Sequence, residues 1–301
     1  MKHTLSVVII TRNRSATLIE NLAHLHTRPR LFHEFIVVDN ASTDDTTTAV
    51  RARFPDVQIV ELARNQGIMA PRNRGAERAR GDLIYFLDDD GKVDLEALPT
   101  MLACFDDDPE VAVVGGRVIN LPAVDVFALD FGDYRPSAPR FRQSSRFRGG
   151  HVVVRKEDFL KVGMLAEAFF YGSEERDLGF RLWKHGKKVM IYDGCVLLHR
   201  KDVTQEGNRR FYQWHYRSRL FMIWRNLPLG KALANTLLNL GAGFFASLRT
   251  GNVRAYMVGV GDGMANLPHV LTRERDPLTT AQYRALQRAC GDDLRASNRW
   301  T

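Results

Sequence analysis

Short apolar runs alternate, over about the first 120 residues, with stretches whose apolar positions recur at helical spacing. The first run, Leu5–Ile10, is continuous and rich in β-branched residues, which is typical of a strand buried on both faces. Strands that alternate with helices indicate an α/β fold, with an open, mostly parallel sheet covered by helices on both faces. We predict further strands over Phe35–Val38, Val57–Leu62 and Leu83–Leu87, and helices over Ala16–His26 (N-cap Ser15), Asp44–Arg53, Ala70–Ala79 and Leu95–Phe105.

The pattern changes after about residue 120. Ala123–Arg148 is rich in Pro, Gly, Ser and Arg without a clear period, and we expect a long mobile loop over the active site. Regular signals then return, over Gly149–Val154 (strand), Ser173–His185 (helix), Val189–His199 (strand) and from Asn208 onward (helix). We therefore expect an α/β domain over residues 1–207, with halves that meet near residue 120, and a helical C-terminal extension over residues 208–301.

Polar side chains gather where three of the predicted strands end. Ligands of open parallel sheets bind at the carboxyl ends of the strands, so these clusters predict one binding site. The clusters are Thr11-Arg12, Asp39-Asn40 and Asp88-Asp89-Asp90.

The triplet Asp88-Asp89-Asp90 is the strongest signal. Carboxylates crowded at the tip of a buried strand repel one another and lose solvation, so something cationic must offset them. A divalent cation that bridges to a diphosphate would do this, because such ions take one or two carboxylates together with phosphate oxygens and water. The alternative is a solvated acidic turn that caps the next helix.

Asp39 could accept a hydrogen bond from a base or a ribose hydroxyl, or it could simply form a turn. Dinucleotide-binding folds also place an acid here, but they need a glycine-rich turn after the first strand. This chain has Thr11-Arg12-Asn13-Arg14 instead, which leaves no backbone cradle for a pyrophosphate. The bulky, basic loop argues against NAD and for a different nucleotide pose.

Three other segments have both a chemical and an ordinary interpretation. Arg72 could reach a phosphate with a forked pair of hydrogen bonds, or lie on a helix surface. Glu174-Glu175, after Ser173 as a predicted N-cap, could supply a base or only favour the helix dipole. Asp177–Arg181 would be an i,i+4 ion pair. His199, at the end of a strand, could be a ligand or a structural residue.

These motifs, in this order, resemble the family-two inverting glycosyltransferases of the GT-A fold, such as bacterial rhamnosyltransferases. The resemblance covers Leu5 to His199 and depends on the ordered combination of weaker motifs. These are an apolar strand then Thr-Arg; Val-Asp-Asn-x-Ser-x-Asp; Asn-x-Gly-x-x-x-x-Arg-Asn-x-Gly; Leu-Asp-x-Asp; Gly-Gly before a strand; Glu-Glu-x-Asp-Leu-x-x-Arg-Leu; and a late His.

The resemblance implies a role for each matching residue. Nucleotide-sugar binding would fall to Thr11, Arg12 and Asp39 (base and ribose), to Asn65 and Arg72 (nucleotide or phosphates), and to Asp88 and Asp89 (ribose and metal waters). Asp90 would be the metal ligand, which His199 completes, and Glu175 the general base. Many relatives have Glu-Asp where this chain has Glu174-Glu175, so the base would be longer by one methylene.

The resemblance further implies transfer of a hexosyl or deoxyhexosyl group from a UDP-, dTDP- or GDP-linked sugar to an acceptor hydroxyl. The resemblance also implies a Mg²⁺ or Mn²⁺ cofactor and inversion of configuration. It implies a glycan or lipid-linked acceptor in bacterial polysaccharide, glycolipid or cell-wall synthesis. A nucleotidyltransferase would need a glycine-rich, lysine-bearing loop after the first strand, and none is visible. Intact Asp90, Glu175 and His199 count against a non-catalytic nucleotide-sugar-binding protein.

Charge and cysteine content indicate the class of ligand and the cellular compartment. The net charge of +8, clustered in Arg135–Lys156 and Arg209–Arg225, suits phosphate-bearing ligands or anionic lipid, while no nucleic-acid-binding motif accompanies the arginines. Three scattered cysteines favour a reducing compartment. The chain opens without a signal-peptide pattern, so we expect a cytoplasmic protein, peripheral at the inner face of the cell membrane.

Ala232–Leu248 has no charged residue and lies between Lys231 and Arg249. Its length is near the lower limit for spanning a bilayer, and Asn235 and Asn239 weaken that interpretation. A packed helix, a homodimer interface and a helix in the plane of a membrane are the other interpretations.

Overall fold

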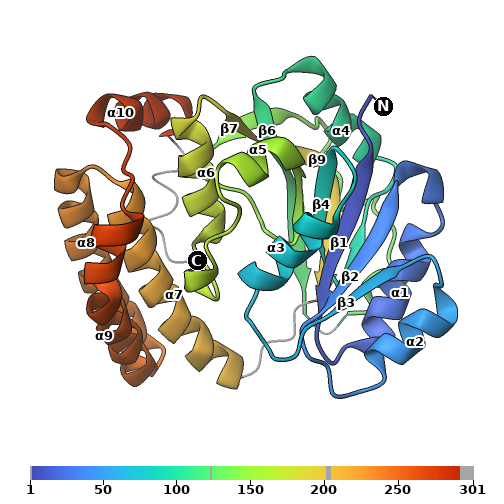
Figure 1. The fold of residues 1–301 in the computed structure, drawn as a ribbon, viewed down its shortest axis with the longest axis horizontal. Coiled ribbons are helices and arrows are strands. Elements are labelled where there is room, and N and C mark those ends of the chain that lie inside the picture. The colour runs from blue at the N-terminus through green and yellow to red at the C-terminus, as the bar shows by residue number, and fades with distance from the viewer. Residues whose placement is uncertain (1, 123, 201–204, 292–301) are drawn as a thin grey trace. The chain divides into compact units, whose positions relative to one another are not determined.

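The computed structural model describes residues 2–122, 124–200 and 205–291, which fall into two compact units (Figure 1). The first unit carries the sheet and contains Met1–Gln143, Phe147–Leu165 and Lys187–Asp202. The second is helical and contains Ser144–Arg146, Ala166–Gly186 and Val203–Thr301. The predicted boundary at residue 207 therefore differs from the structure, because a helix that precedes it belongs with the C-terminal helices.

Neighbouring parallel strands form one half of the sheet, in the order β3-β2-β1-β4. They agree with the predicted strands to within about two residues. Their bounds are β1 Leu5–Thr11, β2 Glu34–Asp39, β3 Gln58–Glu61 and β4 Leu83–Asp88. The predicted α/β fold is confirmed.

The other half of the sheet is mixed, which the sequence analysis did not predict. Strand β8 pairs antiparallel with both β4 and β6, β6 runs parallel to β9, and β5 pairs antiparallel with β9. Strands β5 and β6 were not predicted from the sequence. The bounds are β5 Gly91–Val93, β6 Val111–Leu121, β8 His151–Arg155 and β9 Lys188–Arg200.

Helices cover both faces of the sheet, as predicted. Leu18 and Leu22 of α1 join Val7 and Ile9 in one core cluster, which α2 and α4 complete. On the opposite face Gly75 of α3 lies so close to Val8 that an added methyl carbon would be 2.2 Å from it. The bounds are α1 Ser15–Leu25, α2 Thr46–Arg53, α3 Met69–Arg78, α4 Leu98–Asp107 and α5 Lys156–Lys161, with short turns η1 Pro29–Leu31 and η2 Val126–Ala128. Ser15 is the first residue of α1 and not its N-cap, since Arg14 holds that position without a side-chain cap.

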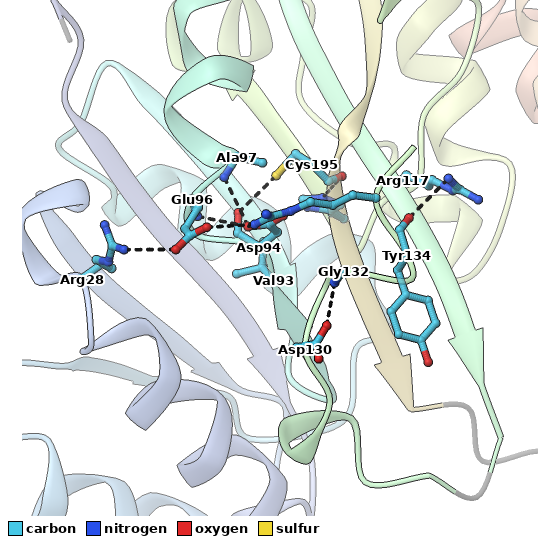
Figure 2. A network of polar contacts seen from close by, with 12 residues as sticks. Arg28, Val93, Asp94, Glu96, Ala97, Arg117, Asp130, Gly132, Tyr134 and Cys195 are labelled. Atoms are coloured by element: carbon cyan, nitrogen blue, oxygen red, sulfur yellow. Dashed lines mark hydrogen bonds and ion pairs between the residues drawn. The ribbon is translucent and has the colours of Figure 1, made fainter. Parts of the chain in front are cut away.

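Much of the segment expected as a mobile loop, Ala123–Arg148, is held in place; Ala123 itself lies outside the described residues. The main anchor is the buried Asp94, which accepts hydrogen bonds from Arg135 Nε at 2.6 Å and Nη2 at 2.8 Å. The backbone N–H groups of Glu96 and Ala97 also donate to Asp94, as Figure 2 shows. The segment also contains η2, whose Val126 packs against β9, and β7 (Phe141–Ser144), which pairs with β9. A bidentate pair to a buried carboxylate keeps this segment close to the sheet edge.

The second unit is built from long helices around α7. Its elements are η3 Glu167–Phe169, α6 Glu174–Lys184, α7 Gln205–Asn226, α8 Leu229–Arg249, α9 Val253–His269, the π-helical turn η4 Val270–Glu274 and α10 Thr280–Ala289. Asp177 joins α6 to α7: its fully buried carboxylate accepts hydrogen bonds from Arg181 of α6, as predicted, and from Asn226 of α7 at 2.7 Å. Arg225 completes the ion cluster at 3.3 Å. This cluster explains why α6 belongs with the C-terminal helices.

Replacing Asp177 by Ala should destabilise the second unit by about 3–5 kcal/mol, because it removes the buried carboxylate that Arg181, Arg225 and Asn226 contact. Denaturant unfolding measures this loss. Asp276→Ala is the matched control, since it removes a mostly exposed partner of Lys184 and should cost about 1 kcal/mol or less. Equal losses in the two variants would contradict a role for the buried cluster.

Helix α8 contains the uncharged stretch Ala232–Leu248. One face is packed: Ala232 and Ser247 are fully buried, and Gly243 lies against Tyr216 of α7. The other face exposes Leu233, Leu237 and Phe245. Over the described residues, no helix combines the length and apolar character needed to cross a membrane. The spanning interpretation is therefore wrong, and the packed interpretation holds for one face only.

Candidate active site

Three strand ends meet at one edge of the sheet in the first unit. Thr11 at the end of β1 is in register with Asp39 at the end of β2, and Asp88 ends β4 on the other side of β1. Asp89 and Asp90 form the turn into β5. Because β5 pairs antiparallel with β9, with Gly91 opposite His199, the late histidine is brought beside the acidic turn. The predicted meeting of these polar clusters is confirmed.

Asn21 of α1 holds the acidic turn from behind. Its buried side chain donates to the carbonyl oxygen of Asp88 at 2.9 Å and to that of Gly91 at 2.8 Å. On the other side, the backbone N–H of Arg200 donates to the carbonyl of Asp90 at 2.9 Å. The turn is therefore fixed through its backbone, which leaves its carboxylates to bind other groups. From the sequence, Asn21 was expected only to lie in a helix.

Asp88, Asp90 and His199 form a group that could hold a cation. One ligand atom from each lies within 4.8 Å of the other two. His199 Nε2 is 3.0 Å from Asp90 Oδ1 and 3.8 Å from Asp88 Oδ2. Asp90 Oδ1 is buried and accepts no well-formed hydrogen bond from the described part of the chain. A buried carboxylate oxygen without a donor is a costly arrangement unless a cation takes its charge.

Asn120 orients the imidazole. Its Oδ1 lies 2.9 Å from His199 Nδ1, and an amide oxygen can only accept, so in neutral His199 the hydrogen is on Nδ1. The lone pair of Nε2 then faces the two carboxylates. A ring nitrogen that donates to an oxygen while the other faces acids is the usual arrangement of a histidine metal ligand.

Two arginines offset part of the acidic charge. Arg14 donates to Asp89 Oδ1 at 2.9 Å and also to Asp90, while Arg72 donates to Asp88 Oδ1 at 3.2 Å. Three carboxylates against two guanidinium groups leave a net charge of about −1 when His199 is neutral. Part of the predicted cationic offset therefore comes from the protein itself. From the sequence, Arg14 was expected only to be part of a bulky, basic loop.

Asp89 is turned away from the cation group. Thr11 Oγ1 donates to its Oδ2 at 2.7 Å, and Arg14 holds its other oxygen. Burial, with the charges of Asp90 and Asp88, raises the pKa of Asp89 to about 6 despite these two donors. Asp89 thus tightens the link between β1 and the turn, while Asp88 and Asp90 face His199.

Two glycines make room for the charged side chains. A methyl carbon added to Gly149 would lie 2.6 Å from Arg72 Nη1, and one added to Gly150 would lie 1.7 Å from Asp88 Oδ2. The Gly-Gly pair before β8 therefore has a steric purpose. It lets the Asp88–Arg72 pair lie against the backbone of the neighbouring chain segment.

Gly150→Ala should displace the Asp88 carboxylate and weaken the predicted metal-dependent binding of a nucleotide sugar by about a hundredfold, since misplacing a binding group by about 1 Å has effects of this size. Calorimetric titration measures it. Gly241→Ala in α8 meets no atom within 4 Å and is the matched control, expected to bind normally. Normal binding by Gly150→Ala would contradict the role given to Asp88.

The predicted nucleotide residues lie in loops that interlock beside the acids. Both oxygens of the buried Asp39 accept from Ser42, so this residue does form the turn that was its ordinary interpretation. Asn65 Oδ1 accepts from Asn40 Nδ2 at 3.0 Å, which ties the loops after β2 and β3 together. Arg12 is exposed, with its Nε 3.5 Å from the carbonyl of Ala41. Thr11, Arg12, Asp39, Asn65 and Arg72 thus belong to one edge of the first unit.

The predicted base lies in the second unit. Glu175 is in the first turn of α6 and is half-buried, while Glu174 beside it is buried. Ser173 holds the predicted N-cap position of α6, with φ of 68°, but its side chain makes no capping hydrogen bond. Acidic residues in a first turn are also favoured by the helix dipole. The role of Glu175 stays a prediction.

Models of two protein families match parts of this chain. The model of glycosyl transferase family 2 matches residues 6–160, and that described as the N-terminal domain of galactosyltransferase matches residues 137–204. Human polypeptide N-acetylgalactosaminyltransferase 16 is 27% identical over 219 residues, covering 62% of this chain. That match covers 38% of the human protein, so this chain spans well under half the length of that relative.

Solved structures share the fold. A crystal structure of GalNAc-T7 with UDP, GalNAc and Mn²⁺ aligns over 89% of this chain and 57% of that one, with a TM-score of 0.67 and 14% identity. A mannosyltransferase of Pyrobaculum calidifontis in complex with GDP-Man and Mn²⁺ aligns over 98% of this chain and 81% of its own, with a TM-score of 0.56 and 17% identity. The predicted GT-A fold is confirmed. With more than half of its residues matched by the family model, the chain belongs to glycosyl transferase family 2.

Proposed function

We propose that this protein transfers a hexosyl or deoxyhexosyl group, with inversion and with the help of a divalent metal, from a nucleotide-diphosphate sugar to an acceptor hydroxyl. The observation that carries the proposal is the group Asp88, Asp90 and His199 at the sheet edge, with a buried carboxylate oxygen that lacks a donor. Nucleotides and Mn²⁺ occur together in the two solved structures that share the fold.

The residues of this group fit Mg²⁺ or Mn²⁺. Two carboxylates and one imidazole are oxygen and nitrogen donors of the kind that such ions accept, and they leave positions for phosphate oxygens and water. The surrounding net charge of about −1 also favours a cation. When bound, the ion would offset the charge that develops on the departing diphosphate.

The chain's own residues would do the rest. Thr11, Arg12 and Asp39 would hold the base and ribose, and Asn65 would shape the loop beside them. Arg72 and Arg14 keep Asp88, Asp89 and Asp90 oriented, so the site is ordered before the donor arrives.

Glu175 would take the proton from the acceptor hydroxyl as its oxygen attacks the anomeric carbon. The new bond joins that oxygen to the anomeric carbon, the bond from this carbon to the diphosphate breaks, and the nucleoside diphosphate leaves with the electron pair. A single displacement with one base inverts the anomeric configuration.

Metal binding should weaken as the pH falls, beginning at pH values above 6.5, because a proton competes for His199 Nε2. Burial opposes protonation of His199, but a protonated Nε2 gains a hydrogen bond to Asp90 and the attraction of the Asp90 and Asp88 charges, which together raise the pKa of His199 above the usual 6.5. As the pH falls, protonation of His199 therefore begins to exclude the metal at pH values above 6.5. Mn²⁺ affinity measured from about pH 8 to about pH 6.5 should fall by up to tenfold per pH unit. In His199→Asn the affinity should be weak and nearly independent of pH over that range; an unchanged slope would refute the assignment.

The two solved structures that share the fold hold different nucleotides, UDP in one and GDP-Man in the other, so the donor must be found by experiment. Purified protein would be incubated with UDP-, dTDP- and GDP-sugars in Mn²⁺ or Mg²⁺, with glycan and lipid-linked acceptors, and release of the nucleoside diphosphate measured. We expect release with one nucleotide class, loss of release in chelator, and an inverted product by NMR. Retention of configuration would refute Glu175 as sole base, and pyrophosphate release would indicate a nucleotidyltransferase instead.

A further inference from the structure

A cavity of about 580 Å³ lies within the second unit, among helices α6, α7, α8 and α10. Cationic side chains from all four helices line it, and no acidic residue is among its lining residues over the described part of the chain. The cations are Arg176, Arg219, Lys231, Arg284 and Arg288. Apolar side chains, including Phe180, Met222, Ile223 and Leu238, complete the wall. The cavity thus combines a charged and an apolar surface.

The charge of three of these cations is only weakly offset. Among the described residues no carboxylate lies within ion-pair distance of Arg176, Arg284 or Arg288. Burial, with the charges of Arg146 and Arg219, lowers the pKa of Arg176 to about 9, although Glu175 acts in the opposite direction. At neutral pH the guanidinium is therefore still charged. Like charges held together in a partly buried cavity destabilise the fold unless an anion joins them.

Helix α8 places an apolar surface next to these cations. Leu229, Leu233 and Leu237 recur at four-residue spacing and are 50–71% exposed. Leu238 lines the cavity and is itself 63% exposed, so the cavity wall continues into this exposed row. Large exposed apolar side chains grouped on one helix face are typical of a surface that contacts a membrane or another protein.

We propose that the cavity binds the phosphate headgroup of an anionic lipid, with the leucine row of α8 against the acyl chains. Arginine forks match phosphate oxygens, and the Lys231 stem can extend along apolar surface while its charge stays at the headgroup. A second copy of this chain on the same surface would bring the two sets of cations together, and like charges disfavour it. This binding is independent of sugar transfer and of the metal site.

Co-sedimentation with vesicles tests the proposal on the full chain. The wild type should bind phosphatidylcholine vesicles that contain phosphatidylglycerol, and bind pure phosphatidylcholine vesicles weakly. Arg284→Ala/Arg288→Ala should weaken binding by about tenfold or more, since each basic residue at a membrane surface has an effect near that of a fivefold change. Both residues are exposed on α10, so the fold should survive.

The matched control removes two exposed arginines elsewhere. Arg30→Ala/Arg53→Ala has the same net charge as the cavity variant. The two replaced arginines make no ion pair with any described residue, so vesicle binding should change by less than about twofold. Leu233→Gln/Leu237→Gln should reduce vesicle binding with an unchanged melting curve. Metal-dependent nucleotide binding, measured on the same samples, should be the same in all variants.

Several results would overturn the proposal. Equal weakening of vesicle binding in the cavity and control variants would mean that binding depends on the net charge of the protein and not on the cavity. Binding of inorganic pyrophosphate through Arg284 and Arg288, without vesicle binding, would assign the cavity to a soluble anion. A dimer in sedimentation that Leu233→Gln/Leu237→Gln dissociates, without vesicle binding, would assign the leucine row to a second copy.

Discussion

Asp90→Asn should lower the rate of sugar transfer by about a thousandfold, because it removes the charge of the most buried member of the proposed metal group. A bound cation contributes several kcal/mol of transition-state stabilisation, and about 4 kcal/mol corresponds to a thousandfold. Asp90 Oδ1 accepts no well-formed hydrogen bond from the described residues. No neighbouring donor would therefore compensate for the lost contact with the cation. The measurement is steady-state release of nucleoside diphosphate over a range of Mn²⁺ concentrations.

The matched control for Asp90→Asn is Asp107→Asn. It makes the same chemical change at an exposed residue at the end of α4 and should leave the rate unchanged. Asp90→Asn should also need far more Mn²⁺ for its remaining activity. A variant with wild-type rate and metal requirement would remove Asp90 from the mechanism.

Glu175→Gln should lower the rate of sugar transfer by a factor of about 10²–10⁴. Glutamine has nearly the size of glutamate, but it cannot take the proton of the acceptor hydroxyl. The half-buried position of Glu175 in the first turn of α6 leaves it accessible to a substrate. Binding of the donor with its metal should survive, because the donor residues all belong to the first unit. Single-turnover transfer and calorimetric donor titration separate the two effects.

Glu174→Gln is the direct comparison, since the two glutamates are adjacent and only Glu174 is buried. We expect it to keep most of the transfer rate. If Glu174→Gln were inactive and Glu175→Gln active, the base would be Glu174. If both were active, the proton would go elsewhere and the mechanism proposed above would be wrong.

The parallel half of the fold was predictable because its signals are local. The apolar runs of β1, β2 and β4 and the leucine spacing of α1 each identify their own element. The meeting of Thr11, Asp39 and Asp88 then follows from the parallel register. For the same reason the acidic turn could be recognised as one end of a site.

Other features depend on pairings that no local pattern contains. Strand β6 was missed, although Val111–Val114 is apolar, because its second half is partly exposed and lacks a clear period. The anchor between Arg135 and Asp94 joins residues 41 positions apart, so the segment that contains Arg135 looked mobile. Arg14 and Asn21 contact the acidic turn only because α1 lies beside β4 and β5.

Manganese binding measured by electron paramagnetic resonance tests the central claim most directly. The claim is that Asp88, Asp90 and His199 hold one divalent cation at the sheet edge. The account predicts about one bound Mn²⁺ per chain, tightened by the cognate nucleoside diphosphate, and lost in Asp90→Asn and in His199→Asn. Equal Mn²⁺ binding by the wild type and both variants, or none by the wild type with the nucleotide present, would contradict it.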